Sequence, residues 1–289
     1  MIYFDIYFEK SCQALGNGMT TVSGLYKCLV LSHFSAINRG FEIHYQSWSQ
    51  GIFASCIPGV KEYQIKKVSK LDKCNYEYTR FNQGWRFWRS PPYVKLCIPN
   101  SYRPKFEVPR GAIAIHAREA GTYDSGWGAD HQPERFVNVE TFHKIALEYA
   151  NKGHMVIQIG TKEMTRFPDH ENIFCLSHLP GKTLMDDLYA MDNCDVMLGT
   201  ESGMEVCAAS FSTPTILSNS CHPVERWWPK VEVGHFVLNK KLVENSSGKV
   251  LSNQEIVDKW GPKRYFARPG YTLLDNTYEE LKGAIDIYL

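Results

Sequence analysis

Short apolar runs alternate with amphipathic segments through the second half of the chain. The runs at 111–116, 155–160 and 196–199 are mainly aliphatic, and a glycine or a polar residue stands at the end of each. This pattern is typical of buried parallel strands, whereas residues 139–151 carry apolar side chains at helical spacing. Further strands are expected at 173–176 and 213–217, and further helices at 183–191, 203–210, 253–260 and 277–288. Because strands and helices alternate, residues 111–220 predict a doubly wound α/β domain.

A second β-α-β pattern opens the chain. Residues 2–8 form an apolar run, residues 20–37 place apolar side chains near one helical face, and residues 41–45 form another short run. This order predicts a parallel sheet with a right-handed crossover. Residues 50–110 contain six prolines and few clean periods, and the stretch at 99–110 is typical of an interdomain linker.

Composition and charge narrow the classes of protein. A chain of 289 residues is long enough for two domains. A formal net charge of +1 gives no reason to expect a nucleic-acid partner or a membrane surface. No apolar run reaches the roughly 18–20 residues of a membrane span, and Asp5 interrupts the apolar start, which therefore resembles a strand and not a signal peptide. Nine cysteines without a C-x-x-C pair predict reduced thiols in a cytoplasmic protein.

Several enzyme motifs are absent or incomplete. The pair Gly16 and Gly18 lacks the third glycine of a dinucleotide fingerprint, because Thr21 stands in its place. Gly181 and Lys182 resemble the end of a phosphate-binding P-loop, but its first glycine would fall on a leucine. No Asp-x-Asp triplet occurs, so we expect no metal that grips a diphosphate through that motif.

Three loops are expected at the carboxyl ends of the parallel strands, where such sheets bind ligands. The first contains His116 and Arg118, and the arginine fork suits the oxygens of a diphosphate. A surface salt bridge is the alternative for Arg118, and a hydrogen-bonded core position is the alternative for His116.

The other two loops also offer polar groups to a ligand. The second loop comprises Thr200, Glu201, Ser202 and Gly203, and it leads into a helix whose first N–H groups attract anions. Ser202 alternatively only caps that helix. The third loop comprises Gln158, Gly160 and Thr161, where the glycine allows a base or ribose to approach closely. An ordinary strand-to-helix turn is the alternative there.

In their order and spacing, these motifs resemble a family of glycosyltransferases found with surface-polysaccharide genes, and more distantly the fucosyltransferases. The matching motifs are H-x-R-[DE] with a Gly/Tyr loop at 116–123, a strand ending at Gly160, C-x-x-x-x-G-T-x-S-G at 194–203, Pro214, Asn219, Leu251, Ser252, Gly270, Tyr271 and Asn276. The resemblance covers residues 111–289 well and residues 1–50 loosely. Glu119 stands where fucosyltransferases have a second arginine. The donor is therefore not restricted to a GDP-sugar, and a UDP-sugar is an alternative.

The resemblance implies an α/β fold of the GT-B type, with two Rossmann-like domains whose parallel sheets face each other across a cleft. Residues 1–105 would form the acceptor-side domain, and residues 106–289 the nucleotide-sugar-binding domain. The implied activity is an inverting, metal-independent transfer of a sugar from a nucleotide-sugar to a glycan acceptor, without a cofactor. The expected contacts to the nucleotide-sugar come from His116, Arg118, Gln158, Gly160, Thr161, Thr200, Glu201, Ser202, Gly203 and Glu205.

Two further roles follow from the same resemblance. An inverting transfer needs a base for the acceptor proton, and Glu119 and Asp124 are the candidates beside Arg118. Gly16, Asn17 and Gly18 are expected on the acceptor side. Two other functions stay open: a polysaccharide pyruvyl transferase-like enzyme, and a non-catalytic protein that binds glycans or nucleotides. No motif specifies the sugar, the acceptor, the linkage or the oligomeric state.

Overall fold

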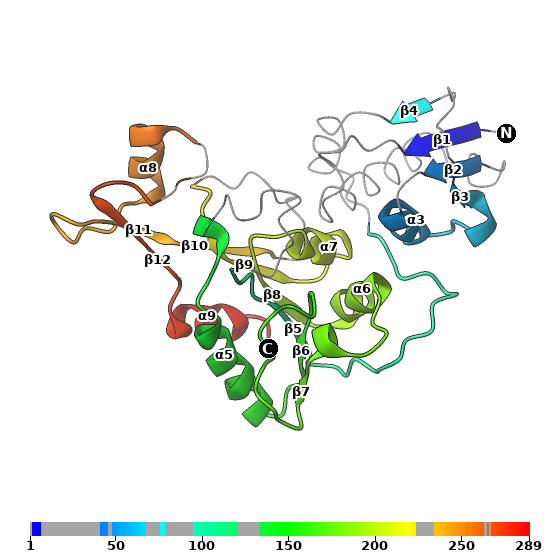
Figure 1. Cartoon of the computed structure of the whole chain (residues 1–289), viewed down its shortest axis with the longest axis horizontal. Coiled ribbons are helices and arrows are strands. Elements are labelled where there is room, and N and C mark those ends of the chain that lie inside the picture. The colour runs from blue at the N-terminus through cyan, green and yellow to red at the C-terminus, as the bar shows by residue number, and fades with distance from the viewer. Residues whose placement is uncertain are drawn as a thin grey trace.

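The computed structural model describes residues 2–6, 41–45, 48–67, 76–78, 95–120, 133–223, 234–262, 265 and 267–289. These residues form two parallel sheets and one antiparallel two-stranded ribbon (Figure 1). The helix expected at 20–37, the expected acceptor-side residues Gly16, Asn17 and Gly18, and the candidate base Asp124 lie outside the described residues.

The first sheet has four parallel strands in the order β3-β2-β1-β4. Its strands are β1 (Ile2–Ile6), β2 (Phe41–Tyr45), β3 (Ile65–Lys67) and β4 (Tyr76–Tyr78). Helix α3 (Trp48–Ser55) and the short 3-10 helix η2 (Glu62–Gln64) follow β2. The predicted strands at 2–8 and 41–45 are confirmed. The sequence did not indicate β3 and β4, because three residues are too few to show a period.

The second sheet has six strands, all parallel, in the order β10-β9-β8-β5-β6-β7. Its strands are β5 (Ile113–His116), β6 (Val156–Gln158), β7 (Ile173–Phe174), β8 (Val196–Thr200), β9 (Thr215–Ser220) and β10 (Phe236–Asn239). The chain starts in the middle at β5, moves outward to β7, and then returns to β8 on the other side of β5. This is the doubly wound order, and its switch point lies between β5 and β8.

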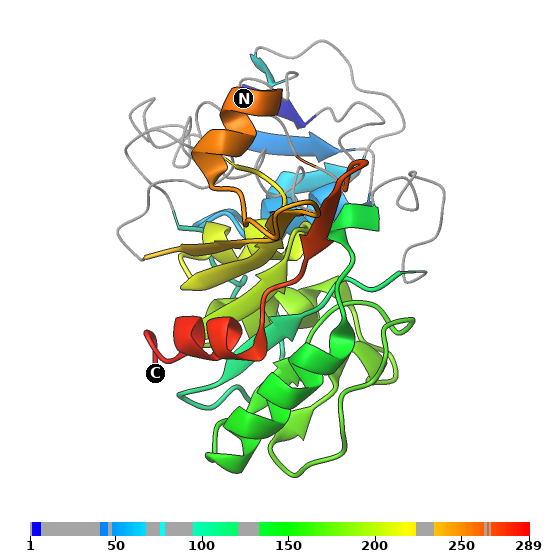
Figure 2. The same cartoon turned by 90° about the vertical axis from the view of Figure 1, so that its left-hand side faces the viewer.

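Helices cover both faces of this sheet. Helices α5 (Val139–Asn151) and α9 (Tyr278–Ile285) pack on one face, and α6 (Leu184–Asn193) and α7 (Met204–Ser210) pack on the other (Figures 1 and 2). Side chains of β5 alternate between the two faces, so that Ile113 and Ile115 meet α5 while Ala114 lies in the core beneath α6 and α7. The α/β fold class is therefore confirmed.

The segment between the sheets is attached to the second sheet's domain. Residues 95–112 contain no helix or strand, and Leu96 donates its N–H to the Ser210 carbonyl at 3.0 Å. Phe53 and Ile57, at and just after the end of α3, share one buried apolar cluster with α6 and α7. Tyr102 donates to Asp186 on α6 at 2.5 Å. The linker prediction thus describes an irregular but anchored segment, and the boundary at 105/106 stays a prediction.

The tail adds a small unit of its own. Strands β11 (Lys241–Glu244) and β12 (Tyr271–Leu274) pair in antiparallel fashion, and α8 (Asn253–Trp260) packs beside them. Its small apolar core consists of Leu242, Leu251, Ile256 and Tyr265. The sequence predicted α8 and α9 but not β10, β11 or β12. Among the described residues, no helix combines the length and the apolar character that crossing a bilayer requires.

Candidate functional site

The loops after β5 and β8 meet at the switch point of the six-stranded sheet. The last residue of β5, His116, lies opposite Gly199 in the ladder, so both strands end at the same level. The Arg118 N–H donates to the Thr200 hydroxyl at 2.9 Å. The structure therefore brings together the first and second predicted loops, as expected for the carboxyl ends of neighbouring parallel strands.

Two arginines converge on the turn at 201–203. The Arg118 side chain is buried, and its Nη1 lies 3.5 Å from the Glu201 carbonyl oxygen. Arg135 donates to that same oxygen through Nε at 2.9 Å and Nη2 at 2.5 Å. The Phe136 ring packs near Arg118, with its centroid 5.7 Å from Cζ. The sequence did not indicate Arg135 as a site residue, because a position 17 residues after Arg118 gives no sign that the two meet.

Burial, together with the positive charge at this site, depresses the basicity of His116. Burial lowers the pKa of His116 to about 3, and the charges of Arg118 and Lys182 add to the shift. The imidazole is therefore neutral at physiological pH, and its Nδ1 lies 3.3 Å from the Ser202 hydroxyl. His116 is thus a hydrogen-bonded core residue beside the two arginines.

The turn before α7 is held by Glu205. The Ser202 N–H donates to one Glu205 carboxyl oxygen at 2.7 Å, and the Ser202 hydroxyl lies 2.8 Å from the other. The Met204 N–H donates to the Ser202 hydroxyl at 3.1 Å. The N-cap residue of α7 is Gly203, and Ser202, directly before it, accepts the first N–H of the helix while its own N–H already has a protein acceptor. Burial raises the pKa of Glu205 to about 8, which leaves this carboxyl largely neutral at pH 7.

The raised pKa of Glu205 predicts that the stability of the protein depends on pH. The pKa of Glu205 rises from its usual 4.5 to about 8 on folding. The neutral Glu205 carboxyl therefore contributes fully to the free energy of unfolding below pH 4.5, and this contribution is lost as the pH rises toward 8. We expect Glu205→Gln to reduce the fall in unfolding free energy between pH 5 and pH 8 by more than about 1 kcal/mol. Urea unfolding at several pH values measures this slope.

A matched control has the same Ser-x-x-Glu spacing on the protein surface. Glu255 caps α8 through Ser252, and a hydrogen bond from Lys249 is the main reason that the pKa of Glu255 falls to about 2. Glu255→Gln should therefore leave the slope between pH 5 and pH 8 unchanged. An equal slope in wild type and Glu205→Gln would contradict the neutral, buried carboxyl.

Glu201 faces two directions. Its carbonyl meets the arginines, whereas its carboxylate pairs with the His222 Nε2 at 3.0 Å. The Cys221 N–H lies 3.5 Å from the same carboxylate, and both partners directly follow β9. The sequence indicated Glu201 but not His222, because no motif links the end of β9 to the end of β8.

The third predicted loop has a largely internal role. The Gln158 amide is buried, and it donates to the Thr165 carbonyl at 2.7 Å and accepts from the Phe167 N–H at 3.2 Å. Thr165 also binds Glu119, through its N–H at 3.0 Å and its hydroxyl at 2.5 Å. Gln158 and Glu119 therefore both fasten the segment that follows β6 and Thr161.

Gly160 contacts a largely buried ion pair that the sequence did not reveal. Its φ is +125°, and an added Cβ would stand 2.3 Å from the Met164 sulfur. Its carbonyl accepts a hydrogen bond from Lys182, which also pairs with Asp187 at 2.5 Å. The glycine is thus required by the packing of the protein itself. The lysine of the incomplete P-loop motif belongs to this ion pair.

In the part of the chain that the structure describes, no group of three or more His, Cys, Asp or Glu side chains is placed to hold a metal ion. Metal-independence stays a prediction.

Comparison with solved structures finds heptosyltransferases with a similar fold. E. coli ADP-heptose LPS heptosyltransferase II has a TM-score of 0.53 and 12% identity over 99% of this chain and 99% of its own. E. coli heptosyltransferase WaaC with ADP-2-deoxy-2-fluoro heptose has a TM-score of 0.51 and 9% identity over 90% of this chain and 98% of its own. No protein-family model and no curated protein match the sequence. At these identities the likeness shows the fold alone, which is GT-B-like as predicted.

Proposed function

We propose that this protein is a glycosyltransferase that moves a sugar from a nucleotide-sugar donor to a glycan acceptor. The observation that supports it most is the convergence of Arg118 and the turn at 201–203 at the switch point between β5 and β8. Doubly wound sheets bind nucleotides at this place, and an arginine fork matches the oxygens of a diphosphate.

The transfer is an inverting displacement that needs no metal. The acceptor hydroxyl oxygen attacks the anomeric carbon, and the bond from that carbon to the diphosphate oxygen breaks. Arg118 stabilises the negative charge that develops on the departing nucleoside diphosphate. The acceptor proton passes to a carboxylate in the loop after β5, for which Glu119 and Asp124 are the candidates. Because Thr165 holds the Glu119 carboxylate, Asp124 is the stronger of the two.

The remaining groups of the site fit a nucleoside. Glu201 is the candidate to accept hydrogen bonds from ribose hydroxyls, whereas both carboxyl oxygens of the buried Glu205 already bind Ser202. Thr161 and Gly203 lie on the loops that follow β6 and β8, where a base and its sugar would approach. Residues 106–289 then bind the donor, and residues 1–105, with Gly16, Asn17 and Gly18, face the acceptor.

The structural neighbours widen the range of donors. Their names and bound ligand include ADP-heptose and an ADP-linked fluoro heptose, so we add ADP-sugars to the UDP- and GDP-sugars suggested by the sequence. The acceptor stays a glycan, as the resemblance of the motifs implies.

A nucleotide panel tests the proposal. We expect one of UDP, GDP, ADP, CMP and dTDP to raise the melting temperature of the protein. At a hundredfold its dissociation constant, that nucleotide adds about 2.7 kcal/mol to the unfolding free energy. The corresponding nucleotide-sugar should then be consumed in the presence of a glycan acceptor. Stabilisation by none of the five, or consumption of phosphoenolpyruvate instead, would overturn the proposal.

A further inference from the structure

Arg135 and Arg118 present their guanidinium groups to one point. The Glu201 carbonyl uses two of the five N–H donors of Arg135 and one of those of Arg118. A carbonyl oxygen is a neutral acceptor with two lone pairs, so it brings the two cations together without contributing a negative charge of its own. An anion with several oxygens, such as a diphosphate, matches two arginine forks better than one.

The loop that carries Arg135 is fastened on several sides. The Val137 N–H donates to the Arg118 carbonyl at 3.1 Å, and the Cys221 thiol donates to the Glu134 carbonyl at 3.3 Å. These two bonds tie the loop to the ends of β5 and β9. The third attachment comes from a more distant part of the chain.

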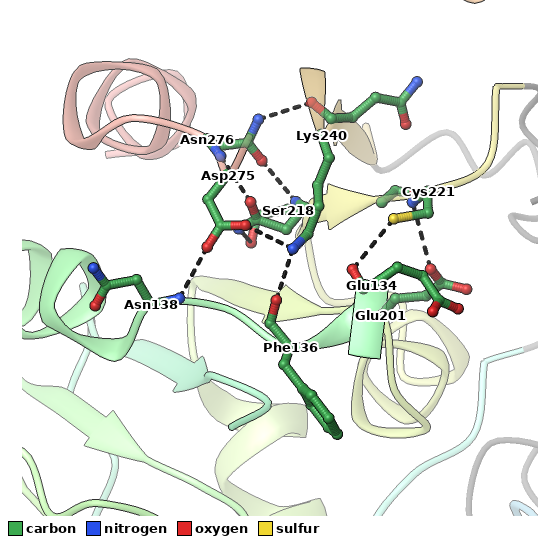
Figure 3. A network of polar contacts seen from close by, with 12 residues as sticks. Glu134, Phe136, Asn138, Glu201, Ser218, Cys221, Lys240, Asp275 and Asn276 are labelled. Carbon is green, nitrogen blue, oxygen red and sulfur yellow. Dashed lines mark hydrogen bonds and ion pairs between the residues drawn. The ribbon is translucent and has the colours of Figure 1, made fainter. Parts of the chain in front are cut away.

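Lys240, between β10 and β11, holds this loop from the tail. Its ammonium donates to the Phe136 carbonyl at 2.7 Å and pairs with Asp275 at 2.6 Å (Figure 3). The other oxygen of Asp275 accepts the Asn138 N–H at 2.9 Å. The Lys240–Asp275 ion pair therefore binds the loop at two residues, Phe136 directly after Arg135 and Asn138 at the start of α5.

Burial and neighbouring hydrogen bonds fix the position of the Lys240–Asp275 ion pair. Only 4% of the Lys240 side chain is exposed. Asn276, next to Asp275, exchanges two backbone-to-amide hydrogen bonds with Asn219 of β9, at 2.6 and 2.7 Å. The loop is therefore held in place relative to the same six-stranded sheet that carries Arg118. A side chain that is fixed in this way loses little conformational entropy when it binds a ligand.

We propose that Arg135 is a second diphosphate-binding cation of the site, and that the Lys240–Asp275 ion pair is what positions it. This inference rests on the proposed function. Phe136 joins the two effects, because its carbonyl receives Lys240 while its ring packs near Arg118. Lys240 and Asp275 are positioning residues and do not touch the substrate.

Binding measurements on Arg135→Ala, on Lys240→Met and on the double variant test both parts. Calorimetry gives the dissociation constant of whichever of UDP, GDP and ADP binds the wild type most tightly, and of its monophosphate. We expect Arg135→Ala to weaken the diphosphate by about tenfold to a hundredfold, the size of a lost charge-assisted hydrogen bond, and to weaken the monophosphate less. Lys240→Met should weaken the diphosphate by about tenfold in the wild type, but less than about twofold in Arg135→Ala, because the residue that it positions is gone.

Two controls separate positioning from general destabilisation. Lys241→Met removes the neighbouring ion pair with Glu280, 2.8 Å long and on the surface, and should leave binding unchanged. Lys240→Arg keeps the cation and should restore most of the affinity. Equal weakening by Lys240→Met in both backgrounds, or unchanged binding in Arg135→Ala, would overturn the inference. A wild type that binds none of UDP, GDP, ADP, CMP and dTDP would instead overturn the proposed function.

Discussion

Replacing Arg118 by alanine is expected to lower sugar transfer by about a hundredfold to a thousandfold, the loss seen when a preorganised donor to a developing negative charge is removed. Arg118 has this effect because its guanidinium is held buried at the switch point. The chain should still fold, since the N–H of residue 118 keeps its bond to Thr200 in the variant. Turnover of the nucleotide-sugar, with circular dichroism for the fold, measures both outcomes.

Two companion variants sharpen this result. Arg118→Lys keeps the charge but loses the fork, so its activity should lie between those of wild type and Arg118→Ala. Arg166→Ala removes an exposed arginine that pairs with Asp169, and should behave as wild type. Near-normal turnover in Arg118→Ala would remove the central support of the proposed function.

Replacing Gly160 by alanine should cost about 2–4 kcal/mol of unfolding free energy, because it combines a strained backbone with an overpacked core. The φ of +125° disfavours any L side chain, and the new methyl group would meet the Met164 sulfur and the His116 ring. Thermal and urea unfolding give the size of the loss.

A glycine elsewhere separates strain from collision. Gly153 has a φ of +90° but open space around its missing Cβ, so Gly153→Ala should cost only about 1 kcal/mol. Removing the sulfur with Met164→Ala should recover part of the loss in the Gly160→Ala background. If both glycine variants lose the same stability, the contact with Met164 contributes nothing.

The sequence was informative where a pattern is local. The run at 111–116 and the helix at 139–151 have clear periods, and both were correctly predicted. The meeting of Arg118 with the turn at 201–203 also followed, because parallel strands end at one edge of a sheet.

Contacts between distant residues were not predictable in the same way. Lys240 and Phe136 are 104 positions apart, and Arg135 and Glu201 are 66 apart, so no spacing rule connects them. Lys182 stood in an incomplete P-loop motif, and only the fold shows its partner Asp187. A buried cation finds its acceptor through tertiary packing, which a single sequence does not display.

The placement of α3 constrains how the two sheets can move. This helix packs against β3 of the first sheet, yet Phe53 and neighbouring residues sit in the same apolar cluster as α6 and α7. A fragment that starts at residue 106 lacks α3. The apolar side chains of α6 and α7 that α3 covers would then be exposed to water, and the fragment should aggregate. Because α3 contacts both parts of the protein, the proline-containing segment at 99–110 cannot act as a hinge on its own. A separation of the first sheet from the second would have to break either the contacts of α3 with β2 and β3 or those of Phe53 and Ile57 with α6 and α7.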